Sequence, residues 1–376
     1  MLWTMALTYP LMVAIQLVSA RIGRVTGCGL AKNLGEVMPR WLVLSLVACL
    51  FFANTINIGA NLSAMGAATQ LVVGGFTQLF AVAFALISLL LQMFISYERY
   101  ASYLKWLTLV LLAYVAVLFV VHVDWGRAAR ELVLPHFPLT RDSFTVVVAI
   151  LGTTISPYLL FWQSSQEVEE IERKPTAEPL KVNPLQAKRE MQRIRLDTLV
   201  GMAVSNLVAL AIIMSAAATL HANGQTQVSS AAQAAEALKP IAGEFAFALF
   251  SLGIIGTGML SLPVLAGSAA YAFGEAQGWK CGLDNKPWEA SGFYSVIAAA
   301  TLLGIGIGFS PLDPIRALFW SAVINGFVAV PIMAAMMWLA GRRDQLGRYT
   351  VSLPVQVLGW SATALMGTAA LSMLVL

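Results

Sequence analysis

The stretch Gly152-Thr153-Thr154-Ile155-Ser156-Pro157-Tyr158 lies in the middle of an apolar segment that begins near Phe144 and ends near Gln163. Proline lacks an N–H and clashes with the carbonyl one turn earlier, and glycine tolerates unusual backbone angles. Together they predict a break in a membrane helix at mid-depth. Irregular backbone at that depth is tolerated only where it is buried in protein or lines a wet cavity. Because transporters bind substrates and ions at such breaks, the stretch predicts a binding site at the membrane midplane.

The composition is that of a polytopic membrane protein. Apolar residues make up 59% of the chain and charged residues only 11%, against roughly 25% charged residues in a soluble domain. Three cysteines form no CxxC pair, so neither a disulfide framework nor a zinc site is indicated. The net charge of +4 gives no reason to expect a nucleic-acid partner, because the basic residues act as topological signals.

Ten segments are apolar over the length of about 20 residues that a membrane-spanning helix needs. They are 2–20, 41–73, 78–97, 104–122, 144–165, 197–221, 243–274, 291–309, 315–340 and 354–375. The expected fold class is therefore an all-α polytopic membrane protein, with the lipid bilayer as a partner.

The basic residues alternate between the two sides of these spans. One side receives only five of the 23 Lys and Arg residues, namely Arg127, Arg130, Arg141, Lys239 and Arg316. Since positive loops stay in the cytoplasm, the Arg- and Lys-rich side is predicted to be cytoplasmic, in a cell inner membrane.

The first span raises a question about the start of the chain. It begins at residue 2, and its far end is cytoplasmic, which places Met1 outside without a preceding helix. The segment is too long for a cleaved signal and lacks a basic start and an Ala-x-Ala end. We therefore expect the sequence to be an N-terminal truncation that lacks an upstream helix.

The second span carries Asn54, Asn57 and Asn61, whose spacings of three and four place them on one helical face. Amides in lipid are costly unless they pair or line a cavity. Two interpretations stay open: hydrogen bonds between helices, or a polar pathway.

The broken span offers a site for a cation. If its first half ends near Thr153, the last carbonyls lack partners and carry partial negative charge. A cation is then expected beside Gly152–Ser156, whereas the positive end after Pro157 suits an anion. The alternative is a proline kink whose backbone groups are satisfied by neighbouring Ser and Thr side chains.

The charged segment from Gln166 to Arg195 is predicted to be a solvated cytoplasmic linker rather than a trap for divalent cations. No buried His, Asp or Glu is expected in the spans. The chain also has no nucleotide-binding glycine loop, no HExxH and no GxSxG motif. An enzymatic role is therefore not expected, since it would need a nucleophile and base, or metal ligands, facing one another at depth.

Several runs resemble the Nramp divalent metal transporters. The segments 7–12 and 20–27 resemble the second helix of that family, Asn54–Leu62 resembles the third, and Gly152–Gln163 resembles the sixth. The resemblance extends from about residue 2 to 375. It is closest to an Nramp-related bacterial branch rather than to the well-known iron and manganese carriers.

The resemblance implies a LeuT-type fold with two inverted repeats of five helices, in which the first and sixth helices are broken. Residues 1–376 would then form a single transmembrane transporter domain, with 1–122 as the remainder of the first repeat, 144–340 as the second repeat and 354–376 as an extra C-terminal helix. The family usually has eleven helices, and the first carries an Asp-Pro-Gly-Asn motif that binds the metal. Half of the expected site is therefore absent from this chain.

The sixth-helix motif departs from the family pattern. The family has Met-Pro-His, where this chain has Ser156, Pro157 and Tyr158, with Thr153 at the position whose carbonyl binds metal. The resemblance thus implies Thr153 and Ser156 as metal ligands. A later family histidine aligns with Gln163, and an acidic position on the proton route aligns with Asn61. The residues expected along the cation pathway are Gly152, Thr154, Pro157, Tyr158, Gln163, Asn54, Asn57 and Asn61.

These departures have chemical meaning. Sulfur favours transition metals, whereas hydroxyls, carbonyls and water suit Mg²⁺, Ca²⁺ and Mn²⁺. The loss of acidic and histidine side chains removes the obvious proton carriers. We expect a secondary transporter or facilitator of divalent metal cations, with Mg²⁺ first and Mn²⁺ second, and with weak or no proton coupling. The metal is then the transported substrate, and no cofactor is expected.

Two other functions remain open from the sequence. The first is a LeuT-fold symporter for an organic substrate such as an amino acid, whose carboxylate would use the positive half-helix ends. The second is a non-transporting remnant or assembly partner, since a chain that lacks one broken helix has an incomplete site.

Overall fold

The computed structural model describes residues 1–95, 97–134, 137–221, 224, 228, 230–309 and 313–375. Within this part the chain forms helices and short 3-10 turns but no strand. The 3-10 turns are Leu109–Leu111, Pro184–Gln186, Gly243–Phe245 and Gly347–Tyr349. The α-helices are α1 (Trp3–Thr26), α2 (Leu30–Val37), α3 (Arg40–Val73), α4 (Thr77–Phe94), α5 (Tyr97–Thr108), α6 (Leu112–Val120), α7 (Trp125–Val133), α8 (Arg141–Thr154), α9 (Pro157–Arg173), α10 (Ala187–Thr219), α11 (Ala231–Glu236), α12 (Lys239–Ala242), α13 (Ala246–Gln277), α14 (Ser291–Gly308), α15 (Pro314–Ala340), α16 (Arg343–Leu346) and α17 (Leu353–Val375).

Ten helical segments in the described ranges are long and apolar enough to cross a membrane, as predicted. Their bounds follow the predicted spans closely at most positions. The fifth predicted span corresponds to α8 and α9 together, Arg141–Arg173. The sixth begins earlier than expected, because helix already starts in the segment that was predicted to be a linker.

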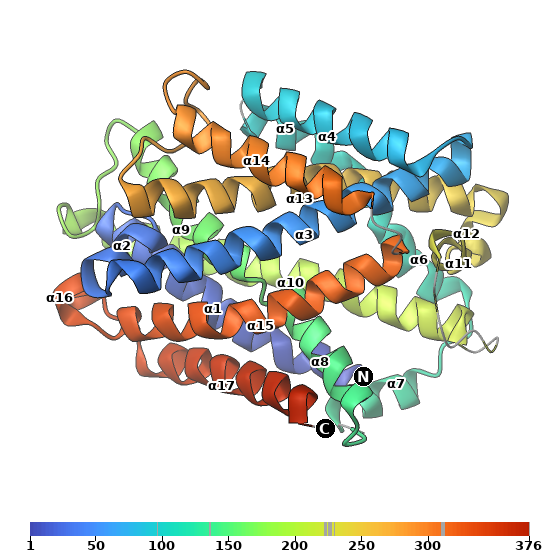
Figure 1. The fold of residues 1–376 in the computed structure, drawn as a ribbon. Coiled ribbons are helices and arrows are strands. Elements are labelled where there is room, and N and C mark those ends of the chain that lie inside the picture. Colours follow the sequence, from blue (N-terminus) through green and yellow to red (C-terminus); the bar gives the residue numbers. More distant parts are fainter. Residues whose placement is uncertain are drawn as a thin grey trace.

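The long helices lie side by side, and the short ones gather at the two ends of the bundle (Figure 1). One end carries α2 and α16, and the other carries α7, α11 and α12. We call the first the basic end; it is formed by the connecting segments 27–39, 174–186, 278–290 and 341–352, which include α2 and α16. The repeat boundaries expected from the resemblance remain a prediction.

Helix α3 runs through the bundle and packs against α4, α13, α14 and α15. It has 34 residues, about 51 Å at 1.5 Å per residue, which exceeds the ~30 Å hydrocarbon core of a typical bilayer. Helix α1 packs on α9 and α10, while α15 packs on α8 and α17. These contacts place the two halves of the broken span against different main neighbours, α15 for α8 and α1 for α9.

Candidate functional site

The predicted break lies between Thr154, the last residue of α8, and Pro157, the first of α9. Ile155 has φ −113° and ψ 59°, and Ser156 is extended with φ −71° and ψ 135°. Proline at the first helical position suits the start of α9, because its fixed φ is helical and its missing N–H would lack an intrahelical partner anyway. The break therefore has the position that Pro157 predicts.

Side-chain hydroxyls satisfy much of the backbone at the break. Ser156, only 1% exposed, donates its hydroxyl to the carbonyls of Gly152 at 2.7 Å and Thr153 at 2.9 Å. Thr154 donates in the same way to the carbonyl of Ile150 at 2.9 Å. The geometry thus agrees with the alternative that the sequence left open, a proline kink whose backbone groups are satisfied by Ser and Thr side chains. Each carbonyl oxygen has two lone pairs, so those of Gly152 and Thr153 still have acceptor capacity for a cation.

The other residues expected near the break differ in exposure. The side chain of Thr153 is exposed, those of Tyr158 and Gln163 are partly buried, and Pro157 is buried. Because Thr153 matches a position whose carbonyl is the expected ligand, its exposed side chain does not bear on that role. The ligand assignments remain predictions.

Gly152 joins α8 to α15 at van der Waals contact between backbones. A Cβ at this position would lie 2.0 Å from the carbonyl oxygen of Ala322 and 2.5 Å from the amide nitrogen of Gly326. No side chain fits there. The end of α8 that carries the candidate carbonyls is therefore fixed against α15.

The asparagine stripe of α3 mainly makes hydrogen bonds between helices. Asn54, fully buried, donates to the hydroxyl of Ser268 on α13 at 2.9 Å. The Oδ1 of Asn57 accepts from the hydroxyl of Ser321 on α15 at 3.0 Å. Asn61 is partly buried and donates within its own helix, to the carbonyl of Asn57 at 2.9 Å. Asn54 and Asn57 therefore follow the interpretation as hydrogen bonds between helices rather than that of a polar pathway.

Helix α15 brings the stripe and the break together. Ser321 bonds to Asn57 on α3, and the next residue, Ala322, contacts Gly152 on α8. The stripe and the break thus lie at similar depth in the bundle. This proximity follows from contacts between three helices and could not be taken from spacing along the chain.

The prediction of a solvated linker from Gln166 to Arg195 is wrong. Helix α9 continues to Arg173 and α10 begins at Ala187, so only 174–186 connects them. Glu167, Glu169 and Glu190 are 4%, 5% and 8% exposed. These carboxylates lie outside the predicted spans 144–165 and 197–221, so they do not bear on the expectation made for the spans. They are matched by Arg24, Arg193 and the hydroxyl of Tyr271.

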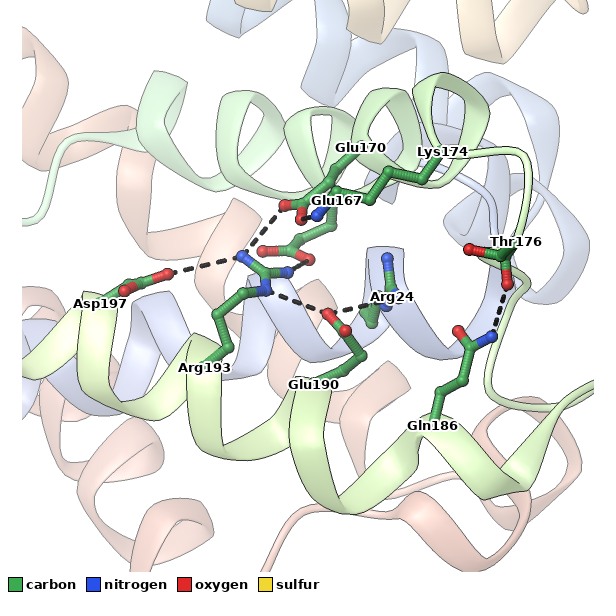
Figure 2. A network of polar contacts seen from close by, with 9 residues as sticks. All are labelled: Arg24, Glu167, Glu170, Lys174, Thr176, Gln186, Glu190, Arg193 and Asp197. Atoms are coloured by element: carbon green, nitrogen blue, oxygen red, sulfur yellow. Dashed lines mark hydrogen bonds and ion pairs between the residues drawn. The ribbon is translucent and has the colours of Figure 1, made fainter.

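Figure 2 shows how Arg193 of α10 joins the carboxylates of α9. Its guanidinium lies 2.6 Å from Glu167 Oε2 and 3.0 Å from Glu170 Oε2. On its own helix it lies 3.0 Å from Glu190 Oε2. The same Oε2 atom of Glu190 lies 3.3 Å from Arg24 of α1, which is 1% exposed. We call Arg24, Glu167, Glu170, Glu190 and Arg193 the ion-pair cluster.

Two further carboxylates bind α9 to other elements. Glu169 accepts from the hydroxyl of Tyr271 on α13 and from the amide of Leu283 at 2.9 Å, in the loop after α13. Glu275 of α13 accepts from the hydroxyl of Ser165 on α9 at 2.6 Å and from the amide of Ala31 in the first turn of α2 at 3.1 Å. These acids are therefore engaged in contacts, and no group of three His, Cys, Asp or Glu in the described part of the chain is placed to hold a metal ion.

A ten-span helical bundle with one span broken at mid-depth, and with polar side chains around the break, is the architecture of a broken-helix membrane transporter. The family described as Nramp, natural resistance-associated macrophage protein-like, matches residues 1–376. The chain therefore belongs to the Nramp family, as the resemblance implied.

Similar proteins include two named divalent metal cation transporter MntH. The protein from Acidiphilium cryptum is 26% identical over 369 residues, which cover 93% of this chain and 77% of that protein. The protein from Burkholderia ambifaria is 26% identical over 368 residues, covering 96% and 78%. An enzymatic role has no support among these relatives, which are named transporters.

Two solved structures share the fold. The manganese transporter of Eremococcus coleocola, in complex with an aromatic bis-isothiourea compound, matches with a TM-score of 0.72 and 16% identity over 98% of this chain and 78% of its own. Mhp1, a nucleobase-cation-symport-1 family transporter, matches with a TM-score of 0.61 and 14% identity over 99% and 84%. At these identities the likeness concerns the fold, which is the LeuT type that was expected.

Proposed function

We propose that this protein transports divalent metal cations across the membrane, by way of the break between α8 and α9. Membership of the Nramp family and the names of the MntH relatives support the transport of such ions. The observation that carries the proposal for the site is the pair of carbonyls at the end of α8, of Gly152 and Thr153, beside the hydroxyl of Ser156.

The chemistry of this group suits a cation. The carbonyl oxygens of Gly152 and Thr153 lie 2.7 and 2.9 Å from the hydroxyl oxygen of Ser156, and the C-terminal end of α8 adds partial negative charge. The hydroxyl of Ser156 donates to both carbonyls. When a cation binds, this hydroxyl would rotate its hydrogen away, and the lone pairs of all three oxygens would then face the cation. Asn61 lies on α3 one turn after Asn57, and its amide oxygen is a further donor atom for the path.

Mn²⁺ is the substrate that we propose first. The solved relative from Eremococcus coleocola is a manganese transporter, and oxygen donors accept Mn²⁺ as well as Mg²⁺. The preference for Mg²⁺ expected from Ser156 has no support among the relatives. The weak proton coupling expected from the loss of acidic and histidine side chains likewise has no support among the relatives. We further propose that the protein lies in a bacterial inner membrane with the basic end in the cytoplasm.

The test is uptake by purified protein in sealed phospholipid vesicles that contain a Mn²⁺-sensitive dye. We expect Mn²⁺ influx above that of protein-free vesicles, driven by an inside-negative potential. Competition by external Mg²⁺ and Cd²⁺ ranks the ions, and a pH dye inside the vesicles reports on proton movement.

The outcomes separate the open alternatives. Specific amino-acid binding without any metal response would favour the organic-substrate symporter. Neither uptake nor binding by folded protein would favour the non-transporting remnant. Ser156→Ala should reduce Mn²⁺ uptake, whereas Ser88→Ala, which changes another fully buried serine on α4, should not.

A further inference from the structure

Both halves of the broken span approach a neighbouring backbone at a glycine, but they differ in the charged contacts near that approach. Helix α8 lies against α15 through uncharged backbone at Gly152. Helix α9 lies against α1 through backbone at Gly23, where a Cβ would lie 2.2 Å from the carbonyl oxygen of Ser164. In addition, its carboxylates and hydroxyls bond to α2, α10 and α13. The charged groups of these contacts gain favourable hydration when they separate.

Arg193 is the centre of the contact between α9 and α10. Glu167 and Glu170 are three residues apart, so both carboxylates face the same guanidinium from one side of α9. Their oxygens lie 2.6 and 3.0 Å from it. The side chain of Glu167 is 5% exposed, whereas that of Arg193 is 28% exposed. Water therefore already reaches one member of the pair.

The guanidinium of Arg24 is almost completely buried, yet two of its nitrogen atoms have no hydrogen-bond partner among the described residues. Its side chain is 1% exposed and forms one ion pair, with Glu190 at 3.3 Å. Its Nε and Nη1 atoms are buried without a hydrogen-bond partner among the described residues. Burying such donors unpaired is costly. This cost destabilises the closed arrangement. If the contact opens, water hydrates the guanidinium of Arg24 and the cost is removed.

We propose that Arg193 is a positioning residue that fixes α9 on α10 and α1, and that α9, rather than α8, moves away when the path from the break to the basic end opens. The ion-pair cluster separates in this step. Each charge then gains water in place of its partner, which offsets much of the lost attraction. The role in transport rests on the proposed function, but the movement itself can be measured without any metal.

The experiment measures thiol reactivity at α1–α9 contacts. Ser19 is fully buried and donates to the carbonyl of Leu160 on α9, so Ser19→Cys places a reporter thiol under that helix. Ser251→Cys is the matched control position, because Ser251 is 4% exposed and donates to the carbonyl of Ala68 on α3, away from the basic end. Both are made in a background in which the three native cysteines are alanine.

Three variants are compared in purified protein with a water-soluble maleimide. Arg193→Gln alone leaves Glu167 as an unpaired buried carboxylate, so Arg193→Gln combined with Glu167→Gln guards against a failure to fold. Arg195→Gln removes the same charge from an exposed position on the same helix. We expect the combined variant to label at position 19 at least tenfold faster than the parent, with position 251 unchanged within twofold. Arg195→Gln should change neither rate.

Two results would overturn the proposal. Labelling at position 19 that stays within twofold of the parent in the combined variant means that the cluster does not restrain α9. A rise at both positions means a general loss of stability rather than movement of one helix. If the parent transports no Mn²⁺ but the selective rise at position 19 appears, the proposed function fails and the movement of α9 stands.

Discussion

Replacement of Gly152 by alanine tests the contact that fixes α8. A Cβ there would lie 2.0 Å from the carbonyl oxygen of Ala322, whereas real Cβ contacts essentially never fall under 3.0 Å. The helices would have to separate by roughly 1 Å, and such overpacking typically costs about 1–3 kcal/mol. Both contacted atoms belong to the backbone, so a side-chain rotation cannot relieve the clash.

Gly201→Ala is the matched control, because a Cβ at Gly201 on α10 would meet nothing within 4 Å. Both substitutions gain the same helix propensity, about 1 kcal/mol, so the difference between them isolates the clash. At on the order of 1–2 °C per kcal/mol for a chain of this size, Gly152→Ala should unfold roughly 1–6 °C below Gly201→Ala. The assay is thermal unfolding of detergent-purified protein, followed by size-exclusion chromatography.

The same variant should affect transport. Separation of α8 from α15 moves the carbonyls of Gly152 and Thr153, so Mn²⁺ uptake should fall in Gly152→Ala and stay at the parental rate in Gly201→Ala. An unfolding midpoint for Gly152→Ala equal to or above that of the control would refute the contact. A lowered midpoint with full uptake would refute the link between this contact and the site.

Three further predictions concern single groups. Ser156→Cys should raise the affinity for Cd²⁺ relative to Mg²⁺ about tenfold in uptake competition, because thiolate is a softer ligand, and an unchanged ratio would place Ser156 away from the metal. Asn57→Ala and Ser321→Ala should show a coupling of about 0.6 kcal/mol in a double-mutant cycle of stability, the average for such bonds in membranes; full additivity would mean that the bond contributes nothing. Burial, with nearby carboxylates, raises the pKa of the Cys281 thiol to about 12, so as the only remaining cysteine it should react with maleimide at pH 7 at least tenfold more slowly than free cysteine, and faster as the pH rises; a rate equal to that of free cysteine would contradict the burial.

Much of the fold follows from the sequence, because each span is a local apolar run and the basic loops alternate between them. The position of the break was also predictable, since Pro157 acts on its own helix and the residue before a proline avoids helical angles. The end of α9 was not, because charged residues usually indicate a solvated segment. Glu167 is buried only because Arg193 lies opposite it, and that arginine is 26 residues away.

The candidate site was predictable in its position but not in its bonding. The spacing of Asn54, Asn57 and Asn61 gave their shared face, which helical geometry dictates. It could not give Ser268 and Ser321 as the partners, since these lie on other helices. The satisfaction of two carbonyls by Ser156 was available as an alternative, because serine bonds readily to the preceding turn. Only the backbone angles of the break decide between this alternative and a break whose carbonyls have no partner.

Proline alone does not explain why this span is broken, since Pro263 lies inside α13 without interrupting it. On both sides of Pro263, α13 packs against the same helix, α3, through Gly258 and Ser268. One continuous neighbour keeps the two halves collinear. On the two sides of Pro157 the main neighbours differ, with α15 and α17 next to α8, and α1 and α13 next to α9, although α1 and α15 each contact both halves. The break persists where the main packing partner changes at the proline, and such a joint allows one half to move while the other stays fixed.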